Sequence, residues 1–169
     1  IGKACALTAE ALRFSCELAK PGVSTLEIAQ KTEDFIVARG GKAAFKGLYG
    51  FPGSICISIN EIIIHGIPDN KVLQEGDIVG IDIGVELDGW LGDTAITIPV
   101  GKISDEDAKI LACAKDALAL AIDSIEEGMR FKKLSGIIED FIVSHGYAPL
   151  KNFCGHGIGR RPHEEPQIL

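Results

Sequence analysis

The chain has 169 residues, 46% of them hydrophobic, which is enough for a domain with a substantial core. Its formal net charge is −7 at pH 7 and it has no basic stripe, so nucleic acid is not expected as a partner. Its apolar runs are all shorter than the roughly 18 residues of a membrane span, which argues against a membrane as a partner.

Two helices are predicted at the start of the chain. The first, near residues 5–19, carries an apolar stripe that consists of Leu7, Ala11, Phe14 and Leu18. The second, near residues 25–39, begins with Ser24 and Glu27, the pattern of a capping box. Two short strands are expected to follow, at Ser54–Asn60 and Ile62–His65.

A β-hairpin is predicted between residues 77 and 98. Its turn is Asp88-Gly89, a dipeptide that suits a two-residue type I′ loop. With this loop the facing pairs are Leu87 with Trp90, Val85 with Gly92, Ile83 with Thr94, Ile81 with Ile96 and Val79 with Ile98. Because side chains alternate along a strand, one face is apolar and consists of Val79, Ile81, Ile83, Val85, Ile96 and Ile98.

Asp82 and Asp93 share the opposite face of this hairpin and are the most informative residues of the chain. Asp82 lies opposite Ala95, and Asp93 is its diagonal neighbour at roughly 7–8 Å. Carboxylates at this spacing can converge on two cations about 3.5–4 Å apart. Two solvated acids on an exposed face are the alternative, but aspartate is disfavoured in strands and a lone buried carboxylate is costly. Three glycines leave space around the pair, namely Gly80, Gly84 and Gly92.

The chain repeats itself at an offset of 106 residues, since EDFIV occurs at 33–37 and again at 139–143, and Gly22 matches Gly128. The second copy stops at Leu169, where strands equivalent to those of the first copy would begin. We therefore expect an α+β domain that is incomplete at its C-terminal side. A chain that begins with Ile1 and has one methionine, Met129, also indicates a fragment.

A second helix pair is predicted near residues 105–126 and 131–144. Ser104 and Asp107 mark the start of the first of these helices, whereas Arg130 replaces the capping serine of the second. The apolar stripe of the first consists of Ile110, Ala114, Leu118, Ala121 and Ile125, and that of the second of Leu134, Ile137, Ile138, Phe141 and Ile142.

His156 lies in the glycine-rich segment 154–160. The Gly-Lys-Ser/Thr of a phosphate loop is absent, and the glycines are not spaced as in a dinucleotide fingerprint. A metal ligand and a turn histidine without a role remain as alternatives. His163 begins a segment that superficially looks like a zinc-protease helix, but the second histidine is missing and Pro166 would break the helix. His163 is near enough in sequence to reach the same cleft as His156.

Three other features allow more than one interpretation. His65 ends an apolar strand, where a structural and a functional role are both open, and His145 is expected at an exposed helix end. The loop 45–52 concentrates aromatic residues and either walls an apolar pocket or simply anchors the loop. The five cysteines are widely spaced without a CxxC pair, which favours reduced thiols and a cytoplasmic protein.

Four segments together resemble the type I methionine aminopeptidases, a family of the pita-bread fold: FKGLYGFPGSICISIN (45–60), HGIPD (65–69), GDIVGIDIGVELDGWLGDT (76–94) and CGHGIGRRPHEEPQ (154–167). The resemblance implies pseudo-symmetric helix pairs packed on a curved antiparallel sheet around a dinuclear metal site. It implies one incomplete metallopeptidase domain over residues 1–169, with a first half at about 1–100 and a truncated second half from about 104.

The resemblance also implies roles for single residues. The metal ligands would be Asp82, Asp93 and His156, and the catalytic histidines that contact substrate would be His65 and His163. The pocket for the methionine side chain would be lined by Phe45, Leu48, Tyr49, Phe51 and Cys56. Two glutamate ligands of the family have no counterpart within the chain. Gly84 stands where the family commonly has threonine, and Pro162 where some members have an aromatic residue.

The implied activity is that of a methionyl aminopeptidase, a metal-dependent hydrolase that matures proteins. It would remove the initiator methionine from nascent proteins and peptides with a small second residue, through hydroxide from a site of two divalent ions (Co, Mn, Fe or Zn). The partners implied are N-terminal peptides, with the ribosome as a candidate, and the protein would be a cytoplasmic monomer. The 169-residue fragment alone is expected to be inactive. The alternatives are an Xaa-Pro-cleaving peptidase and a non-catalytic peptide-binding module of the same fold.

Overall fold

A computed structural model describes residues 1–168 of the chain. These residues form two compact units, which are described separately. The first unit contains Ile1–Ser104 and Ile158–His163, and the second contains Asp105–Gly157 and the residues from Glu164 onward. Among the described residues, no helix is both long and apolar enough to cross a bilayer.

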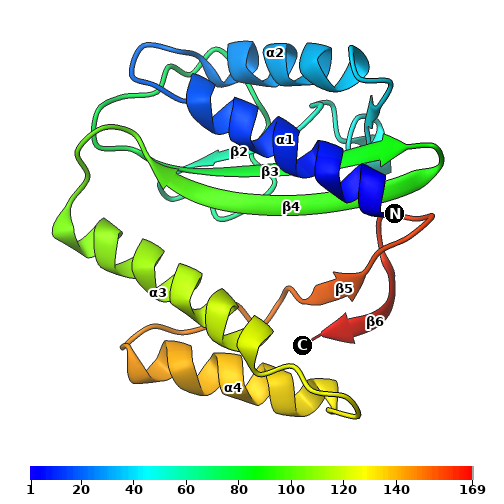
Figure 1. Cartoon of the computed structure of the whole chain (residues 1–169). Coiled ribbons are helices and arrows are strands. Elements are labelled where there is room, and N and C mark those ends of the chain that lie inside the picture. Colours follow the sequence, from blue (N-terminus) through cyan, green and yellow to red (C-terminus); the bar gives the residue numbers. More distant parts are fainter. Residues whose placement is uncertain (169) are drawn as a thin grey trace. The chain divides into compact units, whose positions relative to one another are not determined.

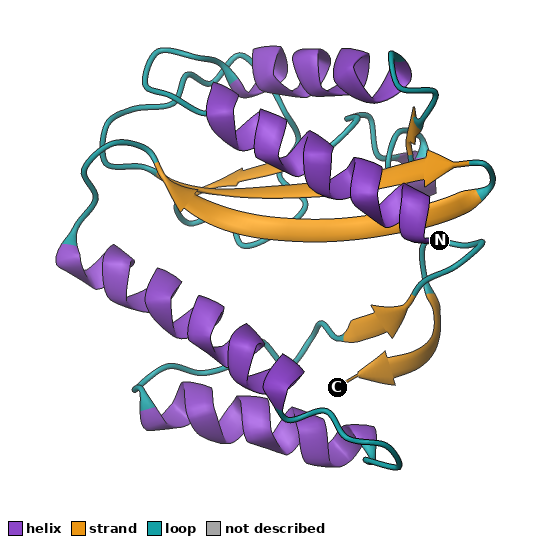
Figure 2. Ribbon diagram, in the orientation of Figure 1, coloured by secondary structure: helices purple, strands orange, loops and turns teal. Residues whose placement is uncertain are grey.

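The first unit is a pair of helices packed on an antiparallel sheet (Figures 1 and 2). The helices are α1 (Gly2–Leu18) and α2 (Thr25–Val37), and the strands are β1 (Lys42–Ala43), β2 (Cys56–Ile59), β3 (Ile78–Leu87) and β4 (Trp90–Pro99), with a short 3₁₀ turn η1 (Leu48–Gly50). Strand β3 is central, because it pairs with β4 along one side and with β1 and β2 along the other. The helix start predicted at Ser24 is confirmed, since its side chain accepts a hydrogen bond from the Glu27 N–H at 3.2 Å.

The predicted register of the hairpin is confirmed in every pair from Leu87–Trp90 to Val79–Ile98. Asp88 and Gly89 both have positive φ (53° and 71°), as a type I′ turn requires. The core lies between β3 and the helices, and its fully buried members include Val79, Ile81, Ile83, Val85, Ile28, Ile36 and Ala11. The apolar face of β3 therefore packs toward α1 and α2, and the opposite face carries Asp82 and Asp93.

One expectation for the first unit is wrong. Ile62–His65 is not a strand: its three isoleucines are exposed and His65 has a left-handed φ of 56°. The reason is that the chain folds back at once, so that the Gly66 carbonyl accepts a hydrogen bond from the Ile57 N–H of β2. The shared face of Ile96 is confirmed by its pairing with Ile81, and its side chain is 45% exposed.

The second unit contains the helices α3 (Asp105–Asp123) and α4 (Phe131–Ser144) and the two-stranded ribbon β5 (Gly155–Gly157) and β6 (Glu164–Ile168). The helix predicted near residues 105–126 ends at Asp123, and four of the five members of its predicted apolar stripe are exposed: Ile110, Ala114, Leu118 and Ile125. The buried side of α3 is formed by small residues, Cys113, Ala117 and Ala121, because the helix packs on α4 through that side.

The helix pairs of the two units repeat at the predicted offset. Helix α2 begins at Thr25 and α4 at Phe131, 106 residues later. The turn glycines repeat as well, with φ of 90° at Gly22 and 80° at Gly128, and of 79° at Gly40 and 83° at Gly146. Left-handed backbone favours glycine at these turns, so the repeat in sequence has a structural cause. The assignment of both halves to one incomplete domain stays a prediction.

The remaining sequence expectations concern single side chains. All five cysteines are free thiols, as predicted. His145 is exposed and lies at the end of α4, also as predicted, and its Nδ1 is 2.8 Å from the carbonyl oxygen of Phe141.

Candidate functional site

The two aspartates lie on neighbouring strands and on one face of the sheet. Asp82 on β3 pairs with Ala95 on one side and with Cys56 of β2 on the other, and Asp93 on β4 pairs directly with Gly84. Asp82 is half-buried and Asp93 is exposed. The face that they share is the one turned away from the buried core of β3.

Cys56 lies beside both carboxylates. Its side chain is 4% exposed, and burial raises the pKa of its thiol from 9.0 to about 12, with further contributions from the negative charges of Asp82 and then of Asp93. Both carboxylates therefore act on the same thiol, which is consistent with a shared face. At neutral pH the thiol is protonated, so Cys56 contributes an apolar surface rather than a thiolate.

Phe45 lies over the same face. The Ala44 N–H donates a hydrogen bond to the Gly84 carbonyl at 2.9 Å, which extends the pairing of β1 with β3. A Cβ atom at Gly84 would lie 2.5 Å from Cε1 of the Phe45 ring. Since Gly84 and Asp82 project to the same side of β3, the aromatic ring lies next to the aspartate pair.

His65 is held at the margin of β2 by the glycine that follows it. The Gly66 N–H donates to the Ser58 hydroxyl at 3.1 Å, while its carbonyl accepts from Ile57. A Cβ atom at Gly66 would collide with the carbonyl oxygen of Ile57, so the close approach of the two backbones requires glycine. Ser58 pairs with Gly80, two residues from Asp82, and this register ties the loop of His65 to the carboxylate-bearing sheet.

The segment that ends in His163 is attached to the tip of the hairpin. The Leu91 N–H donates to the Gly159 carbonyl at 2.9 Å, and the Arg160 guanidinium donates to the Gly89 carbonyl at 3.1 Å. The same guanidinium lies 3.9 Å above the centre of the Trp90 ring, a cation–π contact. No sequence signal pointed to Arg160 or Trp90.

His163 stacks on Tyr49, with ring centres 6.0 Å apart and planes inclined by 17°. Tyr49 is 86% exposed and has a left-handed φ of 49°, so its ring projects away from the core. The structure thus brings together two residues that the sequence predicted to bind substrate. Leu48 and Phe51 lie on the same loop, and both are half-buried.

His156 belongs to the second unit, where it lies on β5 opposite Gln167. Its Nδ1 is 2.9 Å from the Gly157 carbonyl oxygen. A carbonyl can only accept, so in the neutral ring Nδ1 carries the proton and Nε2 has the lone pair that a metal ligand uses.

Asp82 and Asp93 offer part of the donor set that a metal ion needs. Within residues 1–168, no three His, Cys, Asp or Glu side chains gather closely enough to hold a metal. Asp82 and Asp93 nevertheless offer carboxylate oxygens from one face, and oxygen donors of this kind suit divalent ions. The pair fits part of a coordination shell, which further ligands would have to complete.

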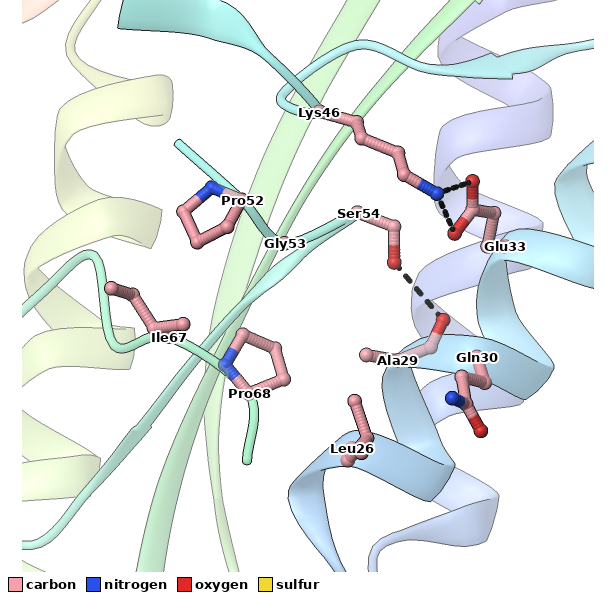
Figure 3. Close-up of a pocket in the computed structure, with 10 residues that line it drawn as sticks. All are labelled: Leu26, Ala29, Gln30, Glu33, Lys46, Pro52, Gly53, Ser54, Ile67 and Pro68. Carbon is pink, nitrogen blue, oxygen red and sulfur yellow. Dashed lines mark hydrogen bonds and ion pairs between the residues drawn. The ribbon is translucent and has the colours of Figure 1, made fainter. Parts of the chain in front are cut away.

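A hollow with a volume of about 310 Å³ lies between α2 and two loops, and the sequence did not indicate it (Figure 3). Its wall contains the ion pair of Lys46 and Glu33 at 2.7 Å, and the Ser54 hydroxyl, which donates to the Ala29 carbonyl at 3.1 Å. Neither aspartate lines it. It is therefore separate from the carboxylate face.

Comparisons with known proteins point to one family. The model of metallopeptidase family M24 matches residues 1–169. A methionine aminopeptidase of Helicobacter pylori (strain ATCC 700392 / 26695) is 57% identical over 166 residues, which cover 98% of this chain and 66% of that protein. The chain therefore spans about two thirds of the length of the curated relatives it matches.

Solved structures agree with this result. The crystal structure of methionine aminopeptidase from Rickettsia prowazekii matches with a TM-score of 0.96 at 36% identity, over 99% of this chain and 67% of that one. A prolidase from Pyrococcus furiosus matches with a TM-score of 0.89 at 28% identity, over 99% of this chain and 49% of that one. The predicted α+β fold of the pita-bread type is confirmed by these likenesses.

Proposed function

Since the chain belongs to metallopeptidase family M24, we propose that the protein is a metal-dependent aminopeptidase that removes the N-terminal methionine from peptides with a small second residue. The observation that carries the proposal is the same-face pair Asp82 and Asp93, flanked by the Phe45 ring and the Cys56 thiol. The 57% identity to a methionine aminopeptidase supports this choice of substrate.

Asp82 and Asp93 are proposed to hold two divalent metal ions, with Co, Mn, Fe and Zn as the candidates. Their assignment rests on the shared face, whereas that of His156 as a further ligand rests on the sequence resemblance. Bound divalent ions would supply Lewis acidity at the scissile carbonyl and lower the pKa of water there. The protein's own contribution is to present carboxylates from paired strands, whose spacing the hydrogen-bonded register maintains.

His65 and His163 are proposed to hydrogen-bond the scissile amide and the negative charge that develops on its oxygen. The backbone beside His65 is tied to a strand, and the ring of His163 stacks on an aromatic ring. Gly66 ties His65 to β2, and Tyr49 supports the ring of His163. Such support keeps donors in place before the substrate arrives, which is where their contribution to catalysis comes from.

The methionine side chain is proposed to lie against Phe45 and the protonated Cys56, with Leu48, Tyr49 and Phe51 as further contacts. An unbranched thioether adapts to an irregular apolar pocket, and sulfur makes favourable contacts with aromatic rings. The substrates would be the N-terminal peptides of nascent proteins, with the ribosome as a candidate partner, and the enzyme would act as a monomer.

The test is hydrolysis of Met-Ala-Ser by the full-length protein after reconstitution with cobalt or manganese. We expect turnover of this peptide, and Asp93→Ala should reduce kcat/KM by about 100-fold or more, because a lost ligand costs more than a lost supporting contact. Asp116→Ala, which removes an exposed carboxylate from α3, is the matched control and should behave as the wild type.

Three results would contradict the proposal. Asp93→Ala with normal turnover would remove the aspartate pair from the mechanism. Faster cleavage of Xaa-Pro peptides than of Met-Ala-Ser would identify the prolidase-type activity instead. A full-length protein that binds no divalent ion, by elemental analysis after reconstitution, would be a peptide-binding module rather than an enzyme.

A further inference from the structure

We infer that Gly84 is a positioning residue that admits the Phe45 ring to the carboxylate face and thereby sets the depth of the pocket for the substrate's first side chain. This inference deepens the proposed function and rests on it. Nothing in the sequence indicated that the two residues are in contact: Phe45 was expected to line the pocket, and Gly84 to leave space around the aspartates.

The contact between Phe45 and Gly84 is close. A Cβ atom at Gly84 would lie 2.5, 2.8 and 3.0 Å from Cε1, Cδ1 and Cζ of the ring, distances that real Cβ atoms do not adopt or adopt rarely. The ring therefore occupies the volume that any other residue's side chain would fill. Gly84 is buried under it, and Phe45 itself is half-buried.

The ring cannot simply move away with its backbone. The Ala44 N–H donates to the Gly84 carbonyl at 2.9 Å, and Ala43 pairs with Val85, so the backbone next to Phe45 is tied to β3. A methyl group at Gly84 would have to displace the ring by nearly 1 Å, from 2.5 Å to the 3.4 Å of ordinary contact. With the backbone held, the side chain must tilt outward from the sheet.

Outward is the side from which a substrate would approach. Gly84 pairs directly with Asp93 and projects to the same face as Asp82, so a ring that tilts away from β3 enters the space in front of the aspartates. A longer side chain would lose room there before a shorter one does. Gly84 thus controls how long a side chain the pocket accepts, although it touches no substrate itself.

Gly80 provides a matched control. It lies on the same strand and the same face, two residues on the other side of Asp82, and its neighbour in β2 is Ser58. A Cβ atom at Gly80 would meet its nearest atoms at 3.6 and 3.7 Å, which is ordinary contact. An alanine side chain therefore fits at Gly80, whereas at Gly84 it would clash with the Phe45 ring.

The experiment compares Gly84→Ala, Phe45→Ala, the double variant and Gly80→Ala in the full-length, metal-loaded protein. Peptides Xaa-Ala-Ser carry either methionine or the shorter 2-aminobutyrate as the first residue. We expect Gly84→Ala to lower kcat/KM for methionine relative to 2-aminobutyrate by about tenfold, mainly through KM. Gly80→Ala should leave this ratio unchanged.

The double variant tests whether the effect of Gly84→Ala arises from displacement of the Phe45 ring. Without the Phe45 ring, the methyl group at Gly84 meets no obstacle, so Gly84→Ala should have no further effect on the ratio in the Phe45→Ala background. The wild type, the two single variants Gly84→Ala and Phe45→Ala, and the double variant also give a cycle of unfolding midpoints in urea, in which Gly84→Ala should destabilise the wild type and not the Phe45→Ala protein. This second readout does not depend on catalysis.

Equal ratios for Gly84→Ala and Gly80→Ala would overturn the inference, and so would additive losses in the double variant. A wild-type protein that does not cleave methionine peptides would refute the proposed function, and with it the role of this pocket in binding methionine. In that case the unfolding cycle still reports whether Gly84 positions Phe45, so the two failures are distinguishable.

Discussion

Cys56 shows at the scale of one residue what surrounds the aspartates. Cys56 is buried in β2 and pairs with Asp82 in the strand register, and the pKa of its thiol is raised to about 12 by burial first and by the two carboxylates second. A group whose pKa is raised on folding holds its proton more tightly in the native state than in the unfolded chain. Its contribution to stability is therefore present at neutral pH and disappears in alkali.

The corresponding prediction concerns the metal-free protein. Below pH 9 both states keep the thiol proton, and between about pH 9 and about pH 12 only the native state does, so the stability from this group is lost as pH rises through that window. The free energy of unfolding, measured in urea, should fall more steeply across this range for the wild type than for Cys56→Ala. Parallel pH profiles for the two proteins would show that the native thiol ionises normally.

At the scale of an element, the loop after β2 shows how a single glycine places a histidine. The run of isoleucines before His65 suggested a strand, but the chain turns back so that Gly66 bonds to both Ile57 and Ser58. These hydrogen bonds connect His65 to the sheet that carries Asp82. The isoleucines are exposed because the loop leaves the sheet rather than extends it.

Gly66→Ala is predicted to destabilise the protein by about 2 kcal/mol or more, because the added methyl group meets a strand backbone that cannot give way. Gly136→Ala is the control, since nothing lies within 4 Å of a Cβ atom at that position in α4. It should stabilise by about 0.5–1 kcal/mol, the difference in helix propensity. Thermal unfolding measures both, and similar midpoints for the two variants would refute the role of Gly66.

At the scale of the whole molecule, burial is distributed unequally between the two units. The large apolar cluster lies entirely within the first unit, between Leu7 and Val100. In the second unit the buried apolar residues include Cys113, Ala117, Ala121 and Leu134, most of them small. On α3, large side chains such as Leu118 and Ile122 are about 60% exposed.

This difference predicts unequal protection from hydrogen exchange in the 169-residue chain. Amides of α3 should exchange about tenfold or more faster than those of β3, because local opening of α3 exposes little additional apolar surface. Exchange followed by mass spectrometry on peptides from both elements measures this. Equal protection of α3 and β3 would contradict the prediction and would mean that the two units open together.

Local physical chemistry was sufficient for much of the fold. The hairpin register follows from the Asp88-Gly89 turn and the period of two, and the start of α2 follows from Ser24. The shared face of Asp82 and Asp93 was predictable to the same degree, because it follows from that register. Which side of α3 is buried could not be predicted, because periodicity identifies an apolar stripe but not the element that packs on it.

By itself, then, the sequence determined the helices, the hairpin, the repeat and the shared face of the two aspartates, because each of these depends on neighbours along one strand, helix or turn. Only the tertiary structure decided that Phe45 lies over Gly84 and that His163 stacks on Tyr49. These contacts join residues far apart in the chain. Their geometry depends on how whole elements pack, which no local pattern records.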